Sequence, residues 1–240
     1  MIHPTALIDP AASVADDVTI GPFCQIGKNV IIEKGAVLQA HVIITGPVTL
    51  KENVRLFSFV KIGNGNASIS VGENSHIREF SQIGNQNETS SSIEIGRDNF
   101  IMAYVQLYPG VTLGDACILT NTVTLLEDVT CEERVIVGGL TTIEAGNTIG
   151  TGVMIGGASY ITHDMPPYCL VEGNRATIKG LNNIGLRRLL DNREDIKAIK
   201  AAFIKIFRNT VDKEMAKELA EQSDNLYVTR LASFAATSNI

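Results

Sequence analysis

Small aliphatic residues recur at every sixth position through most of the first 161 residues. The series starts at Ile8 and continues without a miss to Ile62; after a shift of three positions it resumes at Val71 and ends at Ile161. The residue two positions before each of these is also small and usually apolar. Residues two positions apart in an extended chain point to the same side, so each repeat directs a pair of small side chains inward.

A period of six residues suits neither an amphipathic helix nor a simple hairpin meander, whose side-chain periods are about 3.6 and 2. It is typical of a parallel β-helix built of hexapeptides, in which three sides form a triangular coil of about 18 residues. Successive coils stack at the spacing of neighbouring strands, about 4.8 Å. The repeat therefore predicts a parallel β-helix of about nine coils. The pattern alone leaves the handedness of the coil open, although crossovers are right-handed in general.

Two polar stretches interrupt the repeat. The sequence "NGNASIS" at 64–70 coincides with the shift, and "NQNETSSS" at 85–92 spans a missed repeat at Thr89. Both are expected to be short excursions from a corner of the coil, where a rigid scaffold commonly carries binding groups. Pro166 and Pro167 are expected to end the strand pattern, because proline cannot donate a ladder hydrogen bond.

A helical tail is expected after the prolines. One helix should begin after an N-cap at Asp191 or Asn192 and carry its apolar residues on one face, and two shorter helices should follow it. We therefore expect two domains, a hexapeptide β-helix at residues 1–168 and a helical C-terminal domain at 169–240.

The composition narrows the class of protein. The chain has 45% hydrophobic residues and no tryptophan, so its core must be built from aliphatic side chains. A net charge of −6 argues against general affinity for nucleic acid. Apolar stretches fall short of the roughly 18 residues of a membrane span, and the N-terminus does not resemble a secretory signal. We therefore expect a cytoplasmic protein without membrane insertion.

Cysteines and charges add two expectations. Cys24, Cys117 and Cys131 occupy repeat positions and no CxxC pair is present, so they are expected to pack in the core rather than to bind a metal. Residues 175–208 hold nine Lys or Arg and only three acids. This segment is either a solvated helix face or a docking face for an anion, such as a phosphorylated ligand or an acidic carrier protein.

The stretch "DMPPYCLVEGNRATIKGLNNIGLRR" lies after the hexapeptides and before the helical tail. In this arrangement it resembles the UDP-N-acetylglucosamine (UDP-GlcNAc) O-acyltransferases of lipid A biosynthesis. The resemblance implies a left-handed parallel β-helix and a homotrimer with active sites in clefts between subunits. It also implies transfer of an (R)-3-hydroxyacyl chain from acyl carrier protein to the 3-hydroxyl of UDP-GlcNAc, without a metal or a tightly bound cofactor.

The chain departs from this family where the chemistry is expected. Acyl transfer to a hydroxyl needs a base for its proton, and in the family that base is a histidine in a phrase of the form "AHxxHDCxxG". Matched to "VQLYPGVTLG", the base falls at Pro109 and the earlier histidine at Gln106. Because proline has no titratable group, normal activity is expected to be weak or absent.

Other cleft positions of the family are changed as well. Asp128 and Glu144 occupy two further histidine positions, and each is a weak candidate for a substitute base if burial makes it sufficiently basic. A third such position falls near Gly84. None of the chain's own histidines matches a catalytic position, and each is expected to be a surface or packing residue: His3, His41, His76 and His163.

The resemblance implies a partly preserved nucleotide site after the β-helix. Asn182 and Arg188 match an asparagine and an arginine that contact the nucleotide in the family, and Arg187 stands where the family has a basic residue. Ile184 and Leu189 replace a glutamate and a second arginine. Alternatively, the two arginines only cover the exposed side of a helix.

Two functions therefore remain open from the sequence. The chain is either an acyltransferase of this family with an altered mechanism, or a non-catalytic trimeric paralogue that binds a nucleotide sugar, a carrier protein or another protein. A different sugar acyltransferase that uses coenzyme A is a third alternative.

Overall fold

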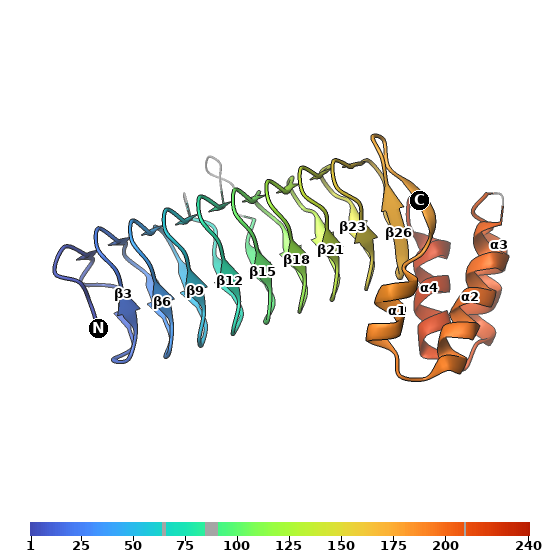
Figure 1. Cartoon of the computed structure of the whole chain (residues 1–240), viewed down its shortest axis with the longest axis horizontal. Helices are drawn as coiled ribbons and strands as arrows, with labels where there is room; N and C mark the ends of the chain where they lie inside the picture. The colour runs from blue at the N-terminus through green and yellow to red at the C-terminus, as the bar shows by residue number, and fades with distance from the viewer. Residues whose placement is uncertain (64–65, 85–90, 209) are drawn as a thin grey trace.

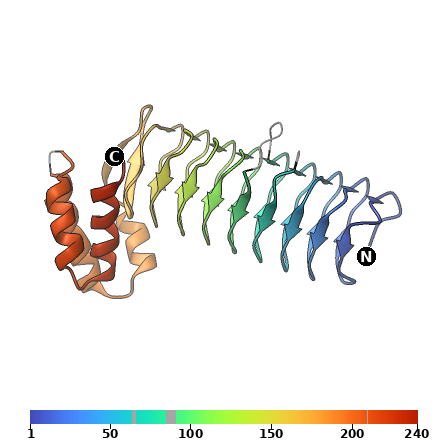
Figure 2. The same ribbon diagram turned by 180° about the vertical axis from the view of Figure 1, so that it is seen from behind.

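The computed structural model describes residues 1–63, 66–84, 91–208 and 210–240. The chain forms a parallel β-helix whose coils stack in sequence order, and four helices gather at its C-terminal end (Figures 1 and 2). Counted over these residues, its three walls are sheet A with ten strands, sheet B with nine and sheet C with eight. The predicted fold class, a parallel β-helix followed by a helical region, is confirmed.

The strands of each sheet follow one another coil by coil. Sheet A contains β3 (Thr19–Ile20), β6 (Val37–Leu38), β9 (Arg55–Leu56), β12 (His76–Ile77), β15 (Phe100–Ile101), β18 (Ile118–Leu119), β21 (Ile136–Val137), β24 (Met154–Ile155), β26 (Cys169–Glu172) and β27 (Thr177–Leu181). Sheet B contains β1 (Leu7–Ile8), β4 (Gln25–Ile26), β7 (Ile43–Ile44), β10 (Lys61–Ile62), β13 (Gln82–Ile83), β16 (Gln106–Leu107), β19 (Thr124–Leu125), β22 (Thr142–Ile143) and β25 (Tyr160–Ile161). Sheet C contains β2 (Ser13–Val14), β5 (Val30–Ile32), β8 (Val48–Leu50), β11 (Ile69–Val71), β14 (Ile93–Ile95), β17 (Thr112–Leu113), β20 (Thr130–Cys131) and β23 (Thr148–Ile149).

The six-residue spacing becomes the interior of the coils. The aliphatic residue of each repeat points inward, and the small residue two positions earlier is buried beside it, as Val105 is beside Leu107. Like side chains stack on one another in successive coils: Ile62 pairs with Ile83, and Leu107 with Leu125. Each fully buried side chain of this size stabilises the fold by about 1.5–3 kcal/mol through the hydrophobic effect.

Three edges run along the β-helix where the chain turns from one sheet to the next, and most of the turns after β3 contain a residue with positive φ. On the A–B edge, between sheets A and B, these residues are Phe23, His41, Phe59, Phe80, Tyr104, Thr122, Leu140 and Ala158. On the B–C edge they are Asn29, Gly46, Gly63, Gly84, Gly110, Asp128 and Gly146. On the C–A edge they are Gly35, Asn53, Asn74, Asp98, Ala116, Arg134, Gly152 and Tyr168. Glycine, asparagine and aspartate adopt positive φ at least cost, and they predominate on the last two edges only.

Both polar interruptions leave the coil at the B–C edge, the first between β10 and β11 and the second between β13 and β14. Residues 64–65 and 85–90 lie outside the described residues. The interruptions lengthen two coils, since Val48 pairs with Ile69 and Ile69 with Ile93, offsets of 21 and 24 residues. Strands β17 and β20 beyond them pair at an offset of 18 residues.

The expectation that Pro166 and Pro167 end the strand pattern is wrong. Sheet A continues past them, because β26 pairs in parallel with β24 and β27 pairs antiparallel with β26. Both prolines are buried where the chain turns, and the flanking Met165 and Tyr168 donate their N–H groups to the preceding coil at 2.9 and 2.8 Å. Neither proline therefore occupies a position where a backbone N–H group must donate a hydrogen bond to the sheet.

In the part of the chain that the structure describes, four helices follow the strands: α1 (Asn183–Leu189), α2 (Arg193–Phe207), α3 (Lys213–Gln222) and α4 (Leu226–Thr237). The expected N-cap of the long helix is confirmed at Asn192, whose side chain accepts a hydrogen bond from the Glu194 N–H at 3.0 Å. Helices α2, α3 and α4 pack together through buried side chains that include Ile199 and Leu231. Among the helices described here, none combines the length and the apolar composition that a membrane span needs.

The helical region is joined to the C–A edge by a small polar network. Arg230 on α4 donates from Nη1 to Glu133 Oε1 at 2.7 Å and to Thr151 Oγ1 at 3.1 Å. The Tyr168 side chain lies buried beside this network, at 1% exposure. Its hydroxyl group has no hydrogen-bond partner within the described part of the chain.

The burial of Tyr168 leads us to expect that the free energy of unfolding falls at alkaline pH. Burial raises the pKa of Tyr168 from 10.0 to about 12, with the nearby Arg230 opposing the rise. An unfolded chain loses this proton at lower pH than the folded one, so the stabilisation is present below pH 10 and is lost between about pH 10 and 12. The shift corresponds to roughly 3 kcal/mol. Urea denaturation between about pH 10 and 12 should show that the free energy of unfolding falls less with pH for Tyr168→Phe than for the unmodified chain.

The buried cysteine thiols lose protons in the same pH range in both proteins. The difference between Tyr168→Phe and the unmodified chain therefore isolates the contribution of the tyrosine. All four cysteines are buried and free, as expected for the three at repeat positions, and burial raises the pKa of Cys117 to about 12. At neutral pH the Tyr168→Phe variant should be about 1 kcal/mol more stable, because it no longer buries a hydroxyl without a partner. Identical alkaline profiles for the two proteins would contradict this account.

Candidate functional site

Pro109 lies in the turn between β16 and β17, on the B–C edge. It is buried, and its carbonyl oxygen accepts a hydrogen bond from the Asp128 N–H of the next coil at 3.0 Å. The neighbouring Gly110 has φ of +80°, and a Cβ there would collide with the Asp128 carboxylate. The stretch "YPG" is therefore a tightly stacked corner that carries no titratable group at Pro109.

Asp128 occupies the equivalent corner one coil further along. Its backbone has φ of +57°, and its side chain is exposed above Gly110. A carboxylate becomes a useful base at neutral pH when it is desolvated. In the single chain, the exposed position of Asp128 does not supply that desolvation.

Glu144 follows β22 and is half-buried. Its Oε1 atom accepts a hydrogen bond from the Tyr160 hydroxyl at 2.6 Å. This bond is the first cause of a raised pKa at Tyr160, with burial and the negative charge of Glu144 acting in the same direction. The phenol is thus held protonated, and one carboxylate oxygen of Glu144 is engaged with it.

Gln106 projects outward from sheet B, on the same wall of the β-helix as Tyr160. It lines a hollow of ≈ 430 Å³ with Phe59, Phe80, Gln82, Tyr104 and Thr122. An amide side chain offers one acceptor and two donor hydrogens, so Gln106 can orient a polar ligand. An amide does not act as a base at neutral pH.

Asn182 and Arg188 meet on a different part of the surface. Both line a cavity of ≈ 410 Å³ between α1 and sheet A, together with Ile184 and Leu189. The Asn182 side chain accepts a hydrogen bond from the Gly185 N–H at 2.8 Å and donates one to the Gly152 oxygen at 3.0 Å. Asn182 therefore also fixes α1 against the last coils, a structural role that its match to the family did not suggest.

Arg188 is exposed and directs its charge to this cavity from α1. Arg187 is exposed on the same helix but does not line the cavity. Apolar side chains from sheet A form the opposite wall: Ile118, Ile136 and Met154. The cavity thus combines a cation, an amide and an apolar wall, a combination suited to a planar base joined to an anionic group.

The expected site residues therefore fall into two groups. Gln106, Pro109, Asp128 and Glu144 lie on sheet B or the B–C edge, whereas Asn182 and Arg188 lie against sheet A. Gly84 lies in the B–C edge with the first group. The two groups occupy different walls of one β-helix, so a single chain does not bring them together.

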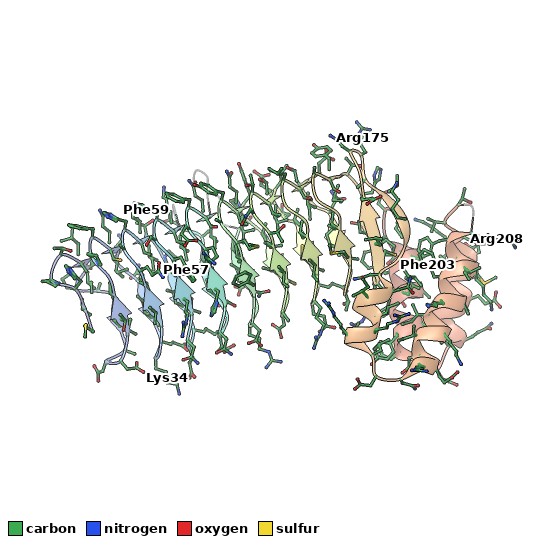
Figure 3. The ribbon with its side chains drawn as sticks, in the orientation of Figure 1. Lys34, Phe57, Phe59, Arg175, Phe203 and Arg208 are labelled. Carbon is green, nitrogen blue, oxygen red and sulfur yellow. The ribbon has the colours of Figure 1, made fainter. Side chains whose placement is uncertain are left out.

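Sequence reasoning missed a cavity of ≈ 640 Å³ between the end of the β-helix and α2. Two aromatic residues of α2, Phe203 and Phe207, line it together with His163, Arg175 and Lys179. Figure 3 labels Arg175 and Phe203 among these residues. The excess of basic residues at 175–208 was the only signal that pointed to this region. Of the nine Lys and Arg residues in this segment, Lys197 alone forms an ion pair within the described residues.

The other histidines lie away from the expected catalytic positions. His41 is stacked between Phe23 and Phe59 on the A–B edge. His76 projects from sheet A between Phe57 and Phe100, and burial, followed by the charges of nearby arginines, lowers its pKa. These two side chains act as packing residues.

Comparisons with known proteins match the whole chain. Family models match residues 164–239, as "Udp N-acetylglucosamine O-acyltransferase; Domain 2", and residues 11–46, as "Bacterial transferase hexapeptide (six repeats)". Curated relatives named acyl-(acyl-carrier-protein)–UDP-N-acetylglucosamine O-acyltransferase occur in Aliarcobacter butzleri and Sulfurovum sp. They are 43% and 39% identical, over 97% and 99% of this chain and 94% and 95% of theirs. A solved UDP-N-acetylglucosamine acyltransferase from Campylobacter jejuni superposes with a TM-score of 0.92 at 33% identity, covering 100% of this chain and 97% of that one.

Proposed function

Because this chain belongs to the UDP-N-acetylglucosamine O-acyltransferase family, we propose that it binds UDP-GlcNAc or a related nucleotide sugar together with acyl carrier protein. We propose that its transfer of an (R)-3-hydroxyacyl chain to the 3-hydroxyl of the sugar is weak or absent. The observation that carries this proposal is Pro109, a buried corner residue without a titratable group at the position of the family's base.

The chemistry of the reaction explains why this one position matters. The sugar hydroxyl attacks the thioester carbonyl of the acyl carrier, and its proton must pass to a base as the new bond forms. Pro109 cannot take that proton. Asp128 is exposed, so it lacks the desolvation that would make its carboxylate more basic. One carboxylate oxygen of Glu144 already accepts a hydrogen bond from the Tyr160 hydroxyl, so that oxygen is not free to take the proton.

A homotrimer accounts for the two separated groups of site residues. If sheet B of one copy faces sheet A of the next, Gln106 and Glu144 come opposite Asn182 and Arg188. The site is then assembled only between copies, as expected for a cyclic arrangement. We propose that residues 1–168 form the β-helix domain and that residues 169–240 form a second domain, which supplies the nucleotide contacts.

The basic segment at residues 175–208 supports binding of an acidic carrier protein. Most of its cations form no ion pair within the described residues, so they are available to a negatively charged partner. Such exposed charges mainly accelerate and orient association rather than add large affinity.

The second candidate function is that of a non-catalytic trimeric paralogue. The engaged carboxylate of Glu144 and the buried corner at Pro109 favour it, because together they leave the cleft with hydrogen-bonding groups and no evident base. In that case the ligand would be held without being acylated.

Calorimetry with UDP-GlcNAc tests the binding that both candidates share. We expect saturable binding, and we expect Arg188→Gln to weaken it about 10- to 100-fold, because a charge-assisted hydrogen bond contributes about 1.5–3 kcal/mol. Arg193→Gln, on the exposed side of α2, is a matched control that should leave the affinity unchanged. The nucleotide-sugar proposal would be abandoned if millimolar UDP-GlcNAc gave no heat of binding.

A further inference from the structure

Arg134 is an exposed residue of the C–A edge, in the turn between β20 and β21, and its backbone has φ of +58°. Its N–H group donates to the Asp115 carbonyl oxygen of the preceding coil at 2.8 Å, a contact that any residue except proline could make. Earlier turns of this edge use residues that adopt positive φ at less cost, namely Gly35, Asn53, Asn74 and Asp98. The backbone of the turn therefore gives no reason for an arginine.

Arg134 lines the cavity of ≈ 410 Å³ between α1 and sheet A, where the other cation is Arg188. The two arginines come from different elements, since Arg134 belongs to a coil of the β-helix and Arg188 to α1. Among the residues described here, no acidic side chain lines this cavity. Two positive charges thus face one cavity from two sides of its wall.

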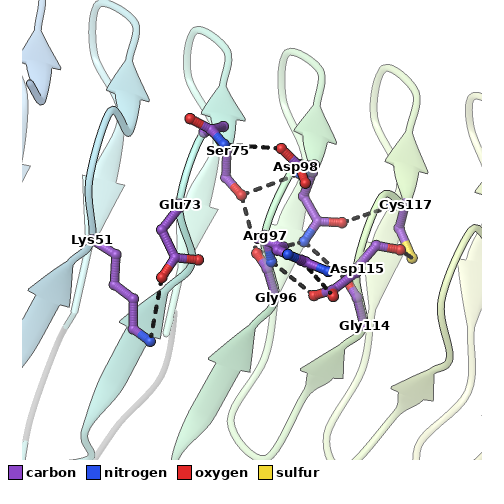
Figure 4. A network of polar contacts seen from close by, with 11 residues as sticks. Lys51, Glu73, Ser75, Gly96, Arg97, Asp98, Gly114, Asp115 and Cys117 are labelled. Carbon is purple, nitrogen blue, oxygen red and sulfur yellow. Dashed lines mark hydrogen bonds and ion pairs between the residues drawn. The ribbon is translucent and has the colours of Figure 1, made fainter.

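The acidic side chains around this turn are held by other partners. Their hydrogen bonds run from Arg230 Nη1 to Glu133 Oε1 at 2.7 Å, from Arg97 Nε to Asp115 Oδ2 at 3.0 Å (Figure 4) and from Thr151 Oγ1 to Glu132 Oε2 at 2.6 Å. Neither Arg134 nor Arg188 forms an ion pair within the part of the chain that the structure describes. Both guanidinium groups are therefore available to an anion in the cavity.

We propose that Arg134 is a specificity-determining residue, which together with Arg188 holds the diphosphate of the nucleotide sugar. This rests on the nucleotide binding of the proposed function. A guanidinium group can pair with two phosphate oxygens through parallel N–H donors, so two arginines suit two linked phosphates. The apolar wall of the same cavity, with Ile118 and Ile136, remains for the base.

This assignment differs from a general attraction between opposite charges. A diffuse positive field would favour every anion, and loss of one arginine would weaken the binding of each anion in proportion to its charge. Two positioned arginines act differently, because the single phosphate of a monophosphate needs only one of them. Loss of Arg134 should therefore remove the advantage of a second phosphate and leave the binding of one phosphate to Arg188.

Calorimetry with uridine diphosphate and uridine monophosphate tests this difference. The unmodified chain should bind the diphosphate at least about tenfold more tightly, because a charge-assisted hydrogen bond is lost with the second phosphate. Arg134→Asn should weaken the diphosphate about tenfold and the monophosphate less than about twofold. Arg193→Gln, on the exposed side of α2, is the matched control and should leave both affinities unchanged.

The possible results separate this inference from the proposal on which it rests. If the unmodified chain binds the diphosphate but Arg134→Asn weakens both ligands equally, or weakens neither, Arg134 does not read the second phosphate while nucleotide binding stands. If the unmodified chain binds neither the diphosphate nor UDP-GlcNAc, both ideas are overturned.

Thermal unfolding distinguishes a loss of affinity from a loss of structure. Arg134→Asn should not lower the unfolding midpoint, because asparagine already occupies the same turn position at Asn53 and Asn74 and adopts positive φ readily. A midpoint that falls together with both affinities would show that Arg134 only maintains the fold, and would overturn its role in specificity.

Discussion

The purified chain is expected to acylate UDP-GlcNAc about 10²- to 10⁴-fold more slowly than a family member with histidine at the position of Pro109. The range is the usual contribution of a general base that is positioned at the reacting hydroxyl. The measurement is a chromatographic assay of acylated UDP-GlcNAc, with a series of (R)-3-hydroxyacyl carrier proteins so that an unusual chain length is not overlooked. Both proteins should be compared under saturating substrate, since the expected defect lies in the chemical step.

Replacement of one residue should not restore the reaction. Pro109→His places an imidazole in a buried corner whose neighbours differ from those of the family, at Gln106, Asp128 and Glu144. We expect this variant to fold and to remain within about tenfold of the unmodified chain, because a base works only when its proton acceptor is aligned with the hydroxyl. Turnover by the unmodified chain within tenfold of an ordinary member would show that another group acts as the base.

Asn99→Ala is expected to lower the free energy of unfolding by about 3 kcal/mol or more. Asn99 is 2% exposed and lies inside the coils, where aliphatic residues are the rule. Its Nδ2 atom donates to the carbonyl oxygens of Gly96 and Gly114 at 2.7 and 2.9 Å, and its Oδ1 atom accepts the Cys117 N–H at 2.8 Å. Figure 4 shows the surrounding network, in which the Ser75 hydroxyl donates to the Gly96 oxygen at 3.0 Å.

The size of this effect follows from what the substitution leaves behind. Alanine would leave the Gly114 carbonyl group and the Cys117 N–H group buried without these partners, and each such group costs about 1–3 kcal/mol. The Gly96 carbonyl group would lose one of its two donors and keep the Ser75 hydroxyl. Urea denaturation measures the loss, and faster hydrogen exchange of the segment around Cys117 would locate it. Asn121→Ala is the control, because Asn121 is exposed and its side chain makes no hydrogen bond to the described residues. An equal loss in both variants would mean that the internal network contributes little.

Most of the β-helix could be predicted because its information is periodic. Ile62, Leu107 and their equivalents mark the interior in every coil, so the number and order of coils follow from counting. Strand β26 could not be found in this way, because the strand signal after Pro166 and Pro167 is short and the prolines mask it. Helix α1 has only seven residues and no acid in its first turn, so it gave little periodic signal.

The candidate site was harder to predict for a physical reason. Binding groups project outward from the coils, where spacing places no constraint on residue type. Glu144 and Tyr160 are 16 residues apart, and only the stacking of coils brings their side chains to 2.6 Å. The stacked rings of the A–B edge were equally hidden, because Phe23, His41, Phe59, Phe80 and Tyr104 follow one another at intervals set by the lengths of whole coils.

The two longer coils have a consequence for how the chain finds its fold. The coils are nearly identical, so a strand that pairs with the wrong neighbouring coil still keeps its aliphatic side chains inside. The hydrophobic effect alone therefore gives such mispairing only a small cost in free energy. The offsets of 21 and 24 residues break this translational symmetry, since a slip past β11 would have to compress or stretch a rung. The two polar excursions therefore fix the register of the coils, because they distinguish the correct strand pairing from pairings shifted by one coil.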